Sequence, residues 1–293
     1  MAAAFSACGH RASTGTTAKA DSVSTDSVKV EASVEEKSAL LIDTINIERS
    51  DSMAEVAISI QWPVKGNEQL VKSIRQFILY ICSIKDNSFK GDKKAFKHYV
   101  DSEYNGLVEN WKDTYADSED GGPAFTSSTT ATKLAETAKF VTYYAESSSY
   151  TGGAHGMAVN IGKTFRKSDG KEIGYRTDYD NGSITASIKN NTLLNDTNSP
   201  KLYALIKDGV KQYFKENGQE MESEEDLKDF MLIDDINRIP LPGNTPYLTE
   251  TGVVFCYMLY EIAPYAAGMI TFEVPYEKIR PLLTEEAQKL ITE

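Results

Sequence analysis

Residues 253–274 form the most apolar segment of the chain. Within it, residues 253–260 and 269–274 are mainly apolar or aromatic, and Pro264 and Gly268 lie in the loop between them. Short apolar runs bounded by Pro and Gly are typical of buried strands, and two such runs around one loop predict a hairpin. Because no other segment is so apolar, we expect this hairpin to lie at the centre of a sheet.

The folded part is predicted to start with another hairpin. Residues 40–47 and 56–62 alternate between apolar and polar side chains, which predicts two strands with one buried face, the second ending at Pro63. A helix capped by Asn67 and a longer helix beginning after Asp92 are expected next. The apolar residues of each helix recur at three- and four-residue steps and so form one buried face: Leu70, Ile74, Phe77, Ile78 and Ile81, then Phe96, Val100, Tyr104, Leu107, Val108, Trp111 and Tyr115.

The remaining segments predict further strands and helices in a mixed order. Residues 134–146 and 157–165 have strand composition and flank the motif Tyr150-Thr-Gly-Gly-Ala-His-Gly156. A helix is expected behind the cap Ser199, and Ser223-Glu-Glu-Asp226 predicts a capping box for a short helix. Strands, two helices, strands, helices and strands in this order predict an α+β fold. We expect mostly antiparallel sheets, helices packed on one side, and two subdomains.

The charge of the chain limits its partners. The 293 residues include 43 Asp and Glu against 31 Lys and Arg, so the formal net charge is −12. An acidic surface repels phosphate backbones, and we therefore expect no nucleic-acid partner. The same charge attracts a cationic partner and speeds its encounter. The sequence also contains no run of about 18 apolar residues that would predict a membrane-spanning helix.

The N-terminus predicts a lipid anchor. Ser6 and Ala7 precede Cys8 in a pattern that resembles the lipobox of bacterial lipoproteins, in which the Cys becomes the lipidated first residue. The apolar stretch before Cys8 is too short for a signal peptide, so we expect the true start to lie upstream of Met1. Residues 9–37 are rich in Ser, Thr, Ala and charge, which predicts a disordered tether. These features place the protein in the cell envelope, attached to a bacterial membrane through Cys8.

The other two cysteines leave two interpretations open. Cys82 and Cys256 lie in apolar surroundings, and an oxidising compartment would permit a disulfide between them. Alternatively, they are separate buried thiols that behave as small hydrophobic side chains. The sequence contains no CxxC motif and no His cluster, so we predict no metal site and no cofactor.

Three motifs together carry a family resemblance. Tyr150–Gly156, the segment Tyr260-Glu-Ile-Ala-Pro-Tyr-Ala-Ala-Gly268 and Val274-Pro-Tyr276 resemble the paired domains of unknown function in RsiV-like and PdaC-like bacterial envelope proteins. The resemblance covers roughly residues 40–283. It implies an N-terminal α+β domain over residues 39–178 that is similar to the PdaC-like domain, and a C-terminal α+β domain over residues 179–293 that is similar to the RsiV-like one. The lipobox-like start and the tether occupy residues 1–38 before them.

The resemblance implies a cell-envelope setting more directly than an activity. RsiV-like proteins are membrane-bound anti-sigma factors whose outer part binds lysozyme, and PdaC-like proteins are peptidoglycan deacetylases in which the paired domains are an accessory region. The sequence shows no counterpart of the sigma-binding segment or of the deacetylase domain. We therefore transfer the fold, and we transfer neither signalling nor deacetylation.

The first two motifs supply the candidate binding residues. The aromatic, imidazole and glycine positions that a binding loop would use are Tyr150, Gly152, Gly153, His155, Tyr260 and Tyr265. A structural interpretation stays open beside this one. Glycines permit positive φ or close approach at a bend, His155 can satisfy buried backbone groups, and the tyrosines can cover the core.

Two functional hypotheses follow from these residues. The first is a non-catalytic, lipid-anchored envelope protein that binds a protein or glycan partner, such as a cationic lysozyme-like protein or peptidoglycan. The alternative is a cell-wall-directed hydrolase in which His155 is the general base and Ser147, Ser148 or Ser149 the nucleophile. No Gly-x-Ser-x-Gly motif marks a nucleophile, and the sequence names no partner for Glu261 in a carboxylate pair.

Overall fold

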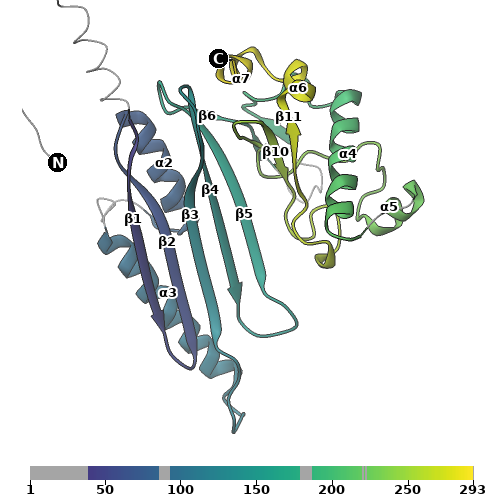
Figure 1. Cartoon of the computed structure of the whole chain (residues 1–293). Helices are drawn as coiled ribbons and strands as arrows, with labels where there is room; N and C mark the ends of the chain where they lie inside the picture. The colour runs from purple at the N-terminus through teal and green to yellow at the C-terminus, as the bar shows by residue number, and fades with distance from the viewer. Residues whose placement is uncertain (1–38, 86–92, 179–186, 220, 222, 293) are drawn as a thin grey trace, which may run out of the picture. The chain divides into compact units, whose positions relative to one another are not determined.

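Six strands in the order β1-β2-β3-β4-β5-β6 form the larger sheet of the protein (Figure 1). The computed structural model describes residues 39–85, 93–178, 187–219, 221 and 223–292. Within the compact unit Ser38–Glu293, the strands of this sheet are β1 (Leu41–Ser50), β2 (Ala54–Lys65), β3 (Phe125–Glu136), β4 (Phe140–Tyr150), β5 (Met157–Arg166) and β6 (Glu172–Ile173). Neighbouring strands are antiparallel except for β2 and β3, which are parallel.

The first hairpin is confirmed, but its second strand is longer than predicted. β2 continues through Pro63 to Lys65 instead of ending at the proline. The pairing of β2 with β3 reaches only Ile60, so beyond that point this side of β2 has no ladder partner among the described strands. The carbonyl oxygen of Pro63 accepts a hydrogen bond from Arg75 Nε at 2.9 Å. Because this side of the strand has no ladder partner, the missing N–H of proline breaks no ladder bond.

Helices α2 (Glu68–Ile81) and α3 (Lys93–Thr114) cover one face of this sheet (Figure 1). Asn67 caps α2 as predicted, because its side-chain oxygen accepts hydrogen bonds from the backbone N–H groups of Gln69 and Leu70. The predicted apolar faces lie between the helices and the sheet. The buried members are Leu70, Ile74, Phe77 and Ile78 of α2, and Phe96, Val100, Tyr104 and Leu107 of α3.

The strand predicted over residues 134–146 is present mainly as β4, but a turn interrupts the predicted segment. β3 ends at Glu136 and β4 begins at Phe140, so the predicted segment contains the turn between two strands. β3 begins at Phe125 with the sequence FTSSTTATKLAE, whose small polar residues give no alternating apolar pattern. Its long-range pairing with β2 on one side and β4 on the other forms this strand, and neither partner is apparent from the local sequence.

A second, three-stranded sheet has the order β11-β10-β9. Its strands are β9 (Tyr247–Leu248), β10 (Gly252–Cys256) and β11 (Thr271–Pro275). The hairpin predicted at residues 253–274 is therefore confirmed, and β10 is the central strand of this smaller sheet. The first strand is shorter than predicted, because it ends at Cys256 and residues 257–270 form the connection to β11, which includes the 3₁₀ helix η1 (Tyr265–Ala267).

Helix α4 (Pro200–Glu216) packs against β11 (Figure 1). Ser199 stands at its N-cap position as predicted, although its side chain makes no capping hydrogen bond. The predicted capping box of α5 (Glu224–Phe230) is present, with reciprocal hydrogen bonds between Ser223 and Asp226. The remaining described elements are short: β7 (Arg176–Asp178), β8 (Ser187–Lys189), α6 (Tyr276–Ile279), η2 (Arg280–Leu282) and α7 (Glu285–Leu290).

The buried apolar residues form two clusters. One lies between α2, α3 and the larger sheet, and the other surrounds α4, β10 and β11. The second cluster also includes Ala135, Phe140, Ile173 and Tyr175, which come from the N-terminal part of the chain. The predicted boundary between residues 178 and 179 adjoins residues 179–186, which lie outside the described part of the structure. The predicted α+β class with mostly antiparallel sheets is confirmed.

The structure also bears on the cysteines and on the membrane. Cys82 and Cys256 are both buried and unpaired, so no disulfide joins them. Burial raises the pKa of the Cys82 thiol to about 12, which keeps it protonated. Cys8 and the predicted tether lie outside the described residues. Over the ranges that the structure describes, every helix is too short or too polar to cross a bilayer.

Candidate functional site

The structure brings the two main sequence motifs together. Residues 151–156 connect β4 to β5, and residues 257–270 connect β10 to β11. The hydroxyl group of Tyr265 in the second connection donates a hydrogen bond to the carbonyl oxygen of Gly156 in the first, at 2.9 Å. Two segments that are more than a hundred residues apart in sequence therefore form one surface.

Three of the predicted residues make a ring cluster at this junction, which we call the His155 cluster. The imidazole of His155 stacks on the ring of Tyr265, with centroids 3.8 Å apart and planes inclined by 19°. The ring of Tyr260 lies 6.4 Å from His155 and 5.7 Å from Tyr265. Close stacking of flat side chains from two loops fixes the orientation of the rings.

The rings of the His155 cluster are accessible to solvent. The side chain of Tyr260 is 50% exposed, that of His155 is exposed, and that of Tyr265 is half-buried. Aromatic rings that are grouped and exposed on a surface are typical of interaction sites. The arrangement therefore favours the binding interpretation of these three residues over a purely structural one.

The other three candidate residues shape the first loop. Gly152 and Gly153 both have φ of +89°, a region that side-chain-bearing residues rarely adopt. The hydroxyl group of Tyr150 donates to the carbonyl oxygen of Gly153 at 3.3 Å and so closes the loop on itself. At Gly156, a Cβ atom would lie 2.7 Å from the carbonyl oxygen of Ser149. Tyr150, Gly152 and Gly153 thus hold the loop that carries His155, and they do not join its ring cluster.

Both ring nitrogens of His155 already have neighbours in the cluster. Nδ1 lies 3.1 Å from the carbonyl oxygen of Gly156, which can only accept, so this nitrogen carries the proton. Nε2 then accepts from the hydroxyl group of Tyr260 at 3.3 Å. Among the described residues, no carboxylate contacts this imidazole, so the Asp-His pair of a hydrolytic triad is not formed here.

Two of the three candidate serines, and the carboxylate considered for a carboxylate pair, have other partners. The hydroxyl groups of Ser147 and Ser148 bond to Thr129 at 3.2 Å and to Ser128 at 2.8 Å, both on β3. The carboxylate of Glu261 accepts from the backbone N–H groups of Gly243 and Met258 at 2.6 and 2.7 Å. Burial raises the pKa of Glu261, and these two hydrogen bonds oppose that rise. Glu261 therefore holds two loops together.

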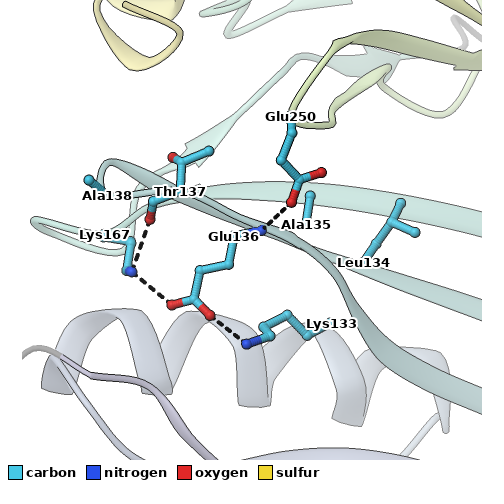
Figure 2. A pocket seen from close by; sticks show the side chains of 8 residues that line it. All are labelled: Lys133, Leu134, Ala135, Glu136, Thr137, Ala138, Lys167 and Glu250. Atoms are coloured by element: carbon cyan, nitrogen blue, oxygen red, sulfur yellow. Dashed lines mark hydrogen bonds and ion pairs between the residues drawn. The ribbon is translucent and has the colours of Figure 1, made fainter. Parts of the chain in front are cut away.

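Among the described residues, several cavities lie away from the His155 cluster. Figure 2 shows one of about 610 Å³ at the β3–β4 turn, where the carboxylate of Glu136 lies between the ammonium groups of Lys133 and Lys167. A groove of about 780 Å³ runs along α2 and β5, and a pocket of about 550 Å³ lies between α2 and the end of β2. No motif in the sequence predicted these cavities, because their lining residues come from separate elements.

A family profile identifies the class of the C-terminal part. The profile of a domain described as a protein of unknown function, DUF3298, matches residues 191–277, the range that contains α4, α5, β9, β10 and β11. A DUF3298 domain is therefore present, and it carries Tyr260 and Tyr265. Over the described ranges, no group of three or more His, Cys, Asp or Glu side chains is placed to hold a metal ion.

Two solved structures have a similar fold. One is a member of the DUF3298 family from Bacteroides fragilis, 18% identical, with a TM-score of 0.63 over 87% of this chain and 98% of that one. The other is a DUF3298 family protein from Pseudomonas aeruginosa, 15% identical, with a TM-score of 0.55 over 86% of this chain and 97% of that one. No curated protein matches the chain. These similarities establish the fold, and the link to RsiV-like and PdaC-like proteins stays a prediction.

Proposed function

We propose that this protein is a non-catalytic, lipid-anchored protein of the bacterial cell envelope that binds a protein or glycan partner through the His155 cluster. The observation that carries the proposal is the exposed stack of His155, Tyr260 and Tyr265 where two loops meet. The loops are held by strands and by internal hydrogen bonds, so the rings are oriented before a partner arrives. Binding then orders few additional side chains, which lowers its entropic cost.

The chemistry of the rings suits both partner classes. Tyrosine rings offer a large apolar face together with a hydroxyl group, which fits side chains of another protein and also the faces and hydroxyl groups of sugars. The net charge of −12 supports a cationic protein such as lysozyme, because opposite charge accelerates association at low salt. The family resemblance points to the same partner, and a cell-wall glycan is the second ligand to test.

Binding is expected to depend on the exposed rings. In titration calorimetry with lysozyme, and in co-sedimentation with purified peptidoglycan, Tyr260→Ala should weaken binding at least about tenfold, which is about 1.4 kcal/mol. Tyr80→Ala is the matched control, because the Tyr80 side chain is 72% exposed and belongs to α2. If neither ligand binds at low salt, or if both variants bind like the wild type, the proposal is wrong.

The same experiments separate binding from hydrolysis. His155→Ala should change the melting temperature little, because the side chain is exposed and surface changes cost about 0.5 kcal/mol or less. We expect the wild type to release no soluble fragments from peptidoglycan. Turnover that is present in the wild type and abolished in the stable His155→Ala variant would instead establish His155 as a general base.

The lipid anchor has its own test. Protein extracted from the membrane fraction of cells that express the natural gene should carry a diacylglycerol group on Cys8, which intact-mass spectrometry and fragmentation detect. A Cys8→Ser variant should lose this mass and leave the membrane fraction. An unmodified Cys8 in membrane-extracted protein would contradict the lipoprotein assignment while leaving the binding proposal intact.

A further inference from the structure

The pocket between α2 and the end of β2, which we call the Trp62 pocket, combines an apolar floor with a cationic rim. Its volume is about 550 Å³, within the range of small-molecule sites. The floor includes the buried side chains of Trp62 and Leu79, and Val64 beside them is 48% exposed. Lys65, Lys72 and Arg75 contribute three cations to the lining, against the single carboxylate of Glu68.

Arg75 is held in place by groups that leave its charge uncompensated. The guanidinium carbon lies 5.0 Å from the centroid of the Trp62 ring, and Nε donates to the carbonyl oxygen of Pro63 at 2.9 Å. Within the described residues, its two terminal nitrogens have no carboxylate partner. Partial burial lowers the pKa of Arg75, and this desolvation disfavours a cation without an anion beside it.

In the other two cavities described above, most of the cations are paired with carboxylates, whereas among the described residues none of the three cations of the Trp62 pocket is. Lys133 and Lys167 share the carboxylate of Glu136 in the pocket of Figure 2. In the groove along α2 and β5, Lys163 pairs with Glu172 and Lys171 with Glu286, and Arg176 is the one lining cation there without an ion pair among the described residues. Neither Lys65 nor Lys72 has such a pair within the described part of the chain. A local excess of positive charge in a protein of net charge −12 favours an anionic ligand.

From this geometry we infer that the Trp62 pocket binds an anionic amphiphile, with its phosphate or carboxylate head on Arg75, Lys65 and Lys72 and its aliphatic chain along Trp62 and Val64. A planar guanidinium fork suits an oxyanion, and flexible lysines add charge around it. The exposed face of Val64 and the floor beneath it gain from covering by an apolar chain, at about 25 cal/mol per Å² buried. A bare inorganic anion would leave this apolar surface in water.

The pocket adjoins the first described residues, because Gly66 lines it and a Cβ atom at this glycine would lie 3.2 Å from Leu40 Cδ1. Two kinds of molecule have the chemistry that the pocket fits. A bilayer lipid and a free fatty acid or alkyl phosphate both present an oxyanion on an aliphatic chain. The inference does not depend on the His155 cluster or on lipidation of Cys8.

Tryptophan fluorescence gives a direct test. The chain has two tryptophans, so in the full-length Trp111→Phe variant the emission comes from Trp62 alone. Octyl phosphate, added below its micelle concentration, should change this emission saturably. Octyl glucoside has the same chain without the charge, and inorganic phosphate has the charge without the chain. Neither octyl glucoside nor inorganic phosphate should reproduce the change in emission. If either compound binds as tightly as octyl phosphate, the inference is wrong.

Charge variants make the test specific to this pocket. Adding Lys65→Gln and Lys72→Gln to the Trp111→Phe background should weaken octyl phosphate binding at least about tenfold. Both side chains are exposed, so the fold is retained, and the melting temperature checks this. Lys112→Gln with Lys228→Gln removes the same charge from exposed positions on α3 and α5 and should leave binding unchanged. Equal binding by the two double variants would contradict the inference.

The source of the ligand is decided with vesicles. If vesicles of phosphatidylglycerol reproduce the Trp62 signal and vesicles of phosphatidylcholine do not, the pocket takes bilayer lipids. If only monomeric octyl phosphate or decanoate gives the signal, the pocket takes free amphiphiles. If none of these ligands gives a saturable signal, the inference is wrong.

Discussion

Thr164→Val is expected to lower the free energy of unfolding by about 3 kcal/mol, because it breaks a closed hydrogen-bond ring between the two sheets. The backbone N–H of Leu248 on β9 donates to Thr164 Oγ1 at 2.8 Å. Thr142 Oγ1 donates to the carbonyl oxygen of Leu248 at 2.7 Å and lies 2.8 Å from Thr164 Oγ1. Since the hydroxyl proton of Thr142 is used for Leu248, Thr164 donates to Thr142, and both hydroxyl groups and both backbone groups of Leu248 are satisfied.

The size of this effect follows from burial. The side chains of Thr142, Thr164 and Leu248 are each 0% exposed, so water cannot replace a lost partner. Valine has nearly the shape of threonine, so the change leaves no cavity. It leaves the N–H of Leu248 without an acceptor and the hydroxyl oxygen of Thr142 without a donor. Each buried unsatisfied group costs about 1–3 kcal/mol.

Urea unfolding followed by tryptophan fluorescence measures this loss. Thr126→Val is the matched control, because Thr126 is an exposed strand residue on β3 and the change should be within about 0.5 kcal/mol of neutral. Thr164→Ser retains the hydroxyl group and should recover most of the stability. If Thr164→Val unfolds at the same urea concentration as Thr126→Val, the ring contributes nothing to the joint between the sheets.

Local signals in the sequence predicted the helices and hairpins well. The cap Asn67, the capping box at Ser223 and the apolar steps of α2 all act within one or two turns of helix, so their information is contained in the segment itself. The alternation of β1 and β2 similarly reports one buried face. Most of β3 was missed because its residues are mainly Ser, Thr and Ala and its stability comes from pairing with β2 and β4.

The site was predicted as residues but not as an arrangement. The aromatic, glycine and histidine positions pointed to two loops, and the contact between His155 and Tyr260 joins residues 105 positions apart. That contact depends on how the two sheets are joined, for example at Thr164, and no local pattern encodes this. The Trp62 pocket was missed for a related reason, since its cations are ordinary surface lysines and an arginine until the fold places them around one floor.

Gly209→Ala should destabilise the protein by about 2 kcal/mol, although alanine is the better helix former by about 1 kcal/mol. A Cβ atom at this position in α4 would lie 2.1 Å from Cδ2 of Phe272 on β11. The Phe272 ring cannot move aside easily, because it is stacked on Phe255 at 5.6 Å and faces Tyr257 at 6.4 Å. Removing the clash therefore requires α4 to shift away from the hairpin.

Gly106→Ala is the matched control and should have the opposite sign. Gly106 lies within α3, is exposed, and has no atom within 4 Å of an added Cβ. Only the propensity gain remains there, so this variant should be more stable by up to about 1 kcal/mol. Thermal unfolding of the two variants measures the difference. If Gly209→Ala is also stabilising, α4 does not pack closely on the hairpin of residues 253–274. The core that supports the loop of Tyr260 and Tyr265 would then be wrongly placed as well.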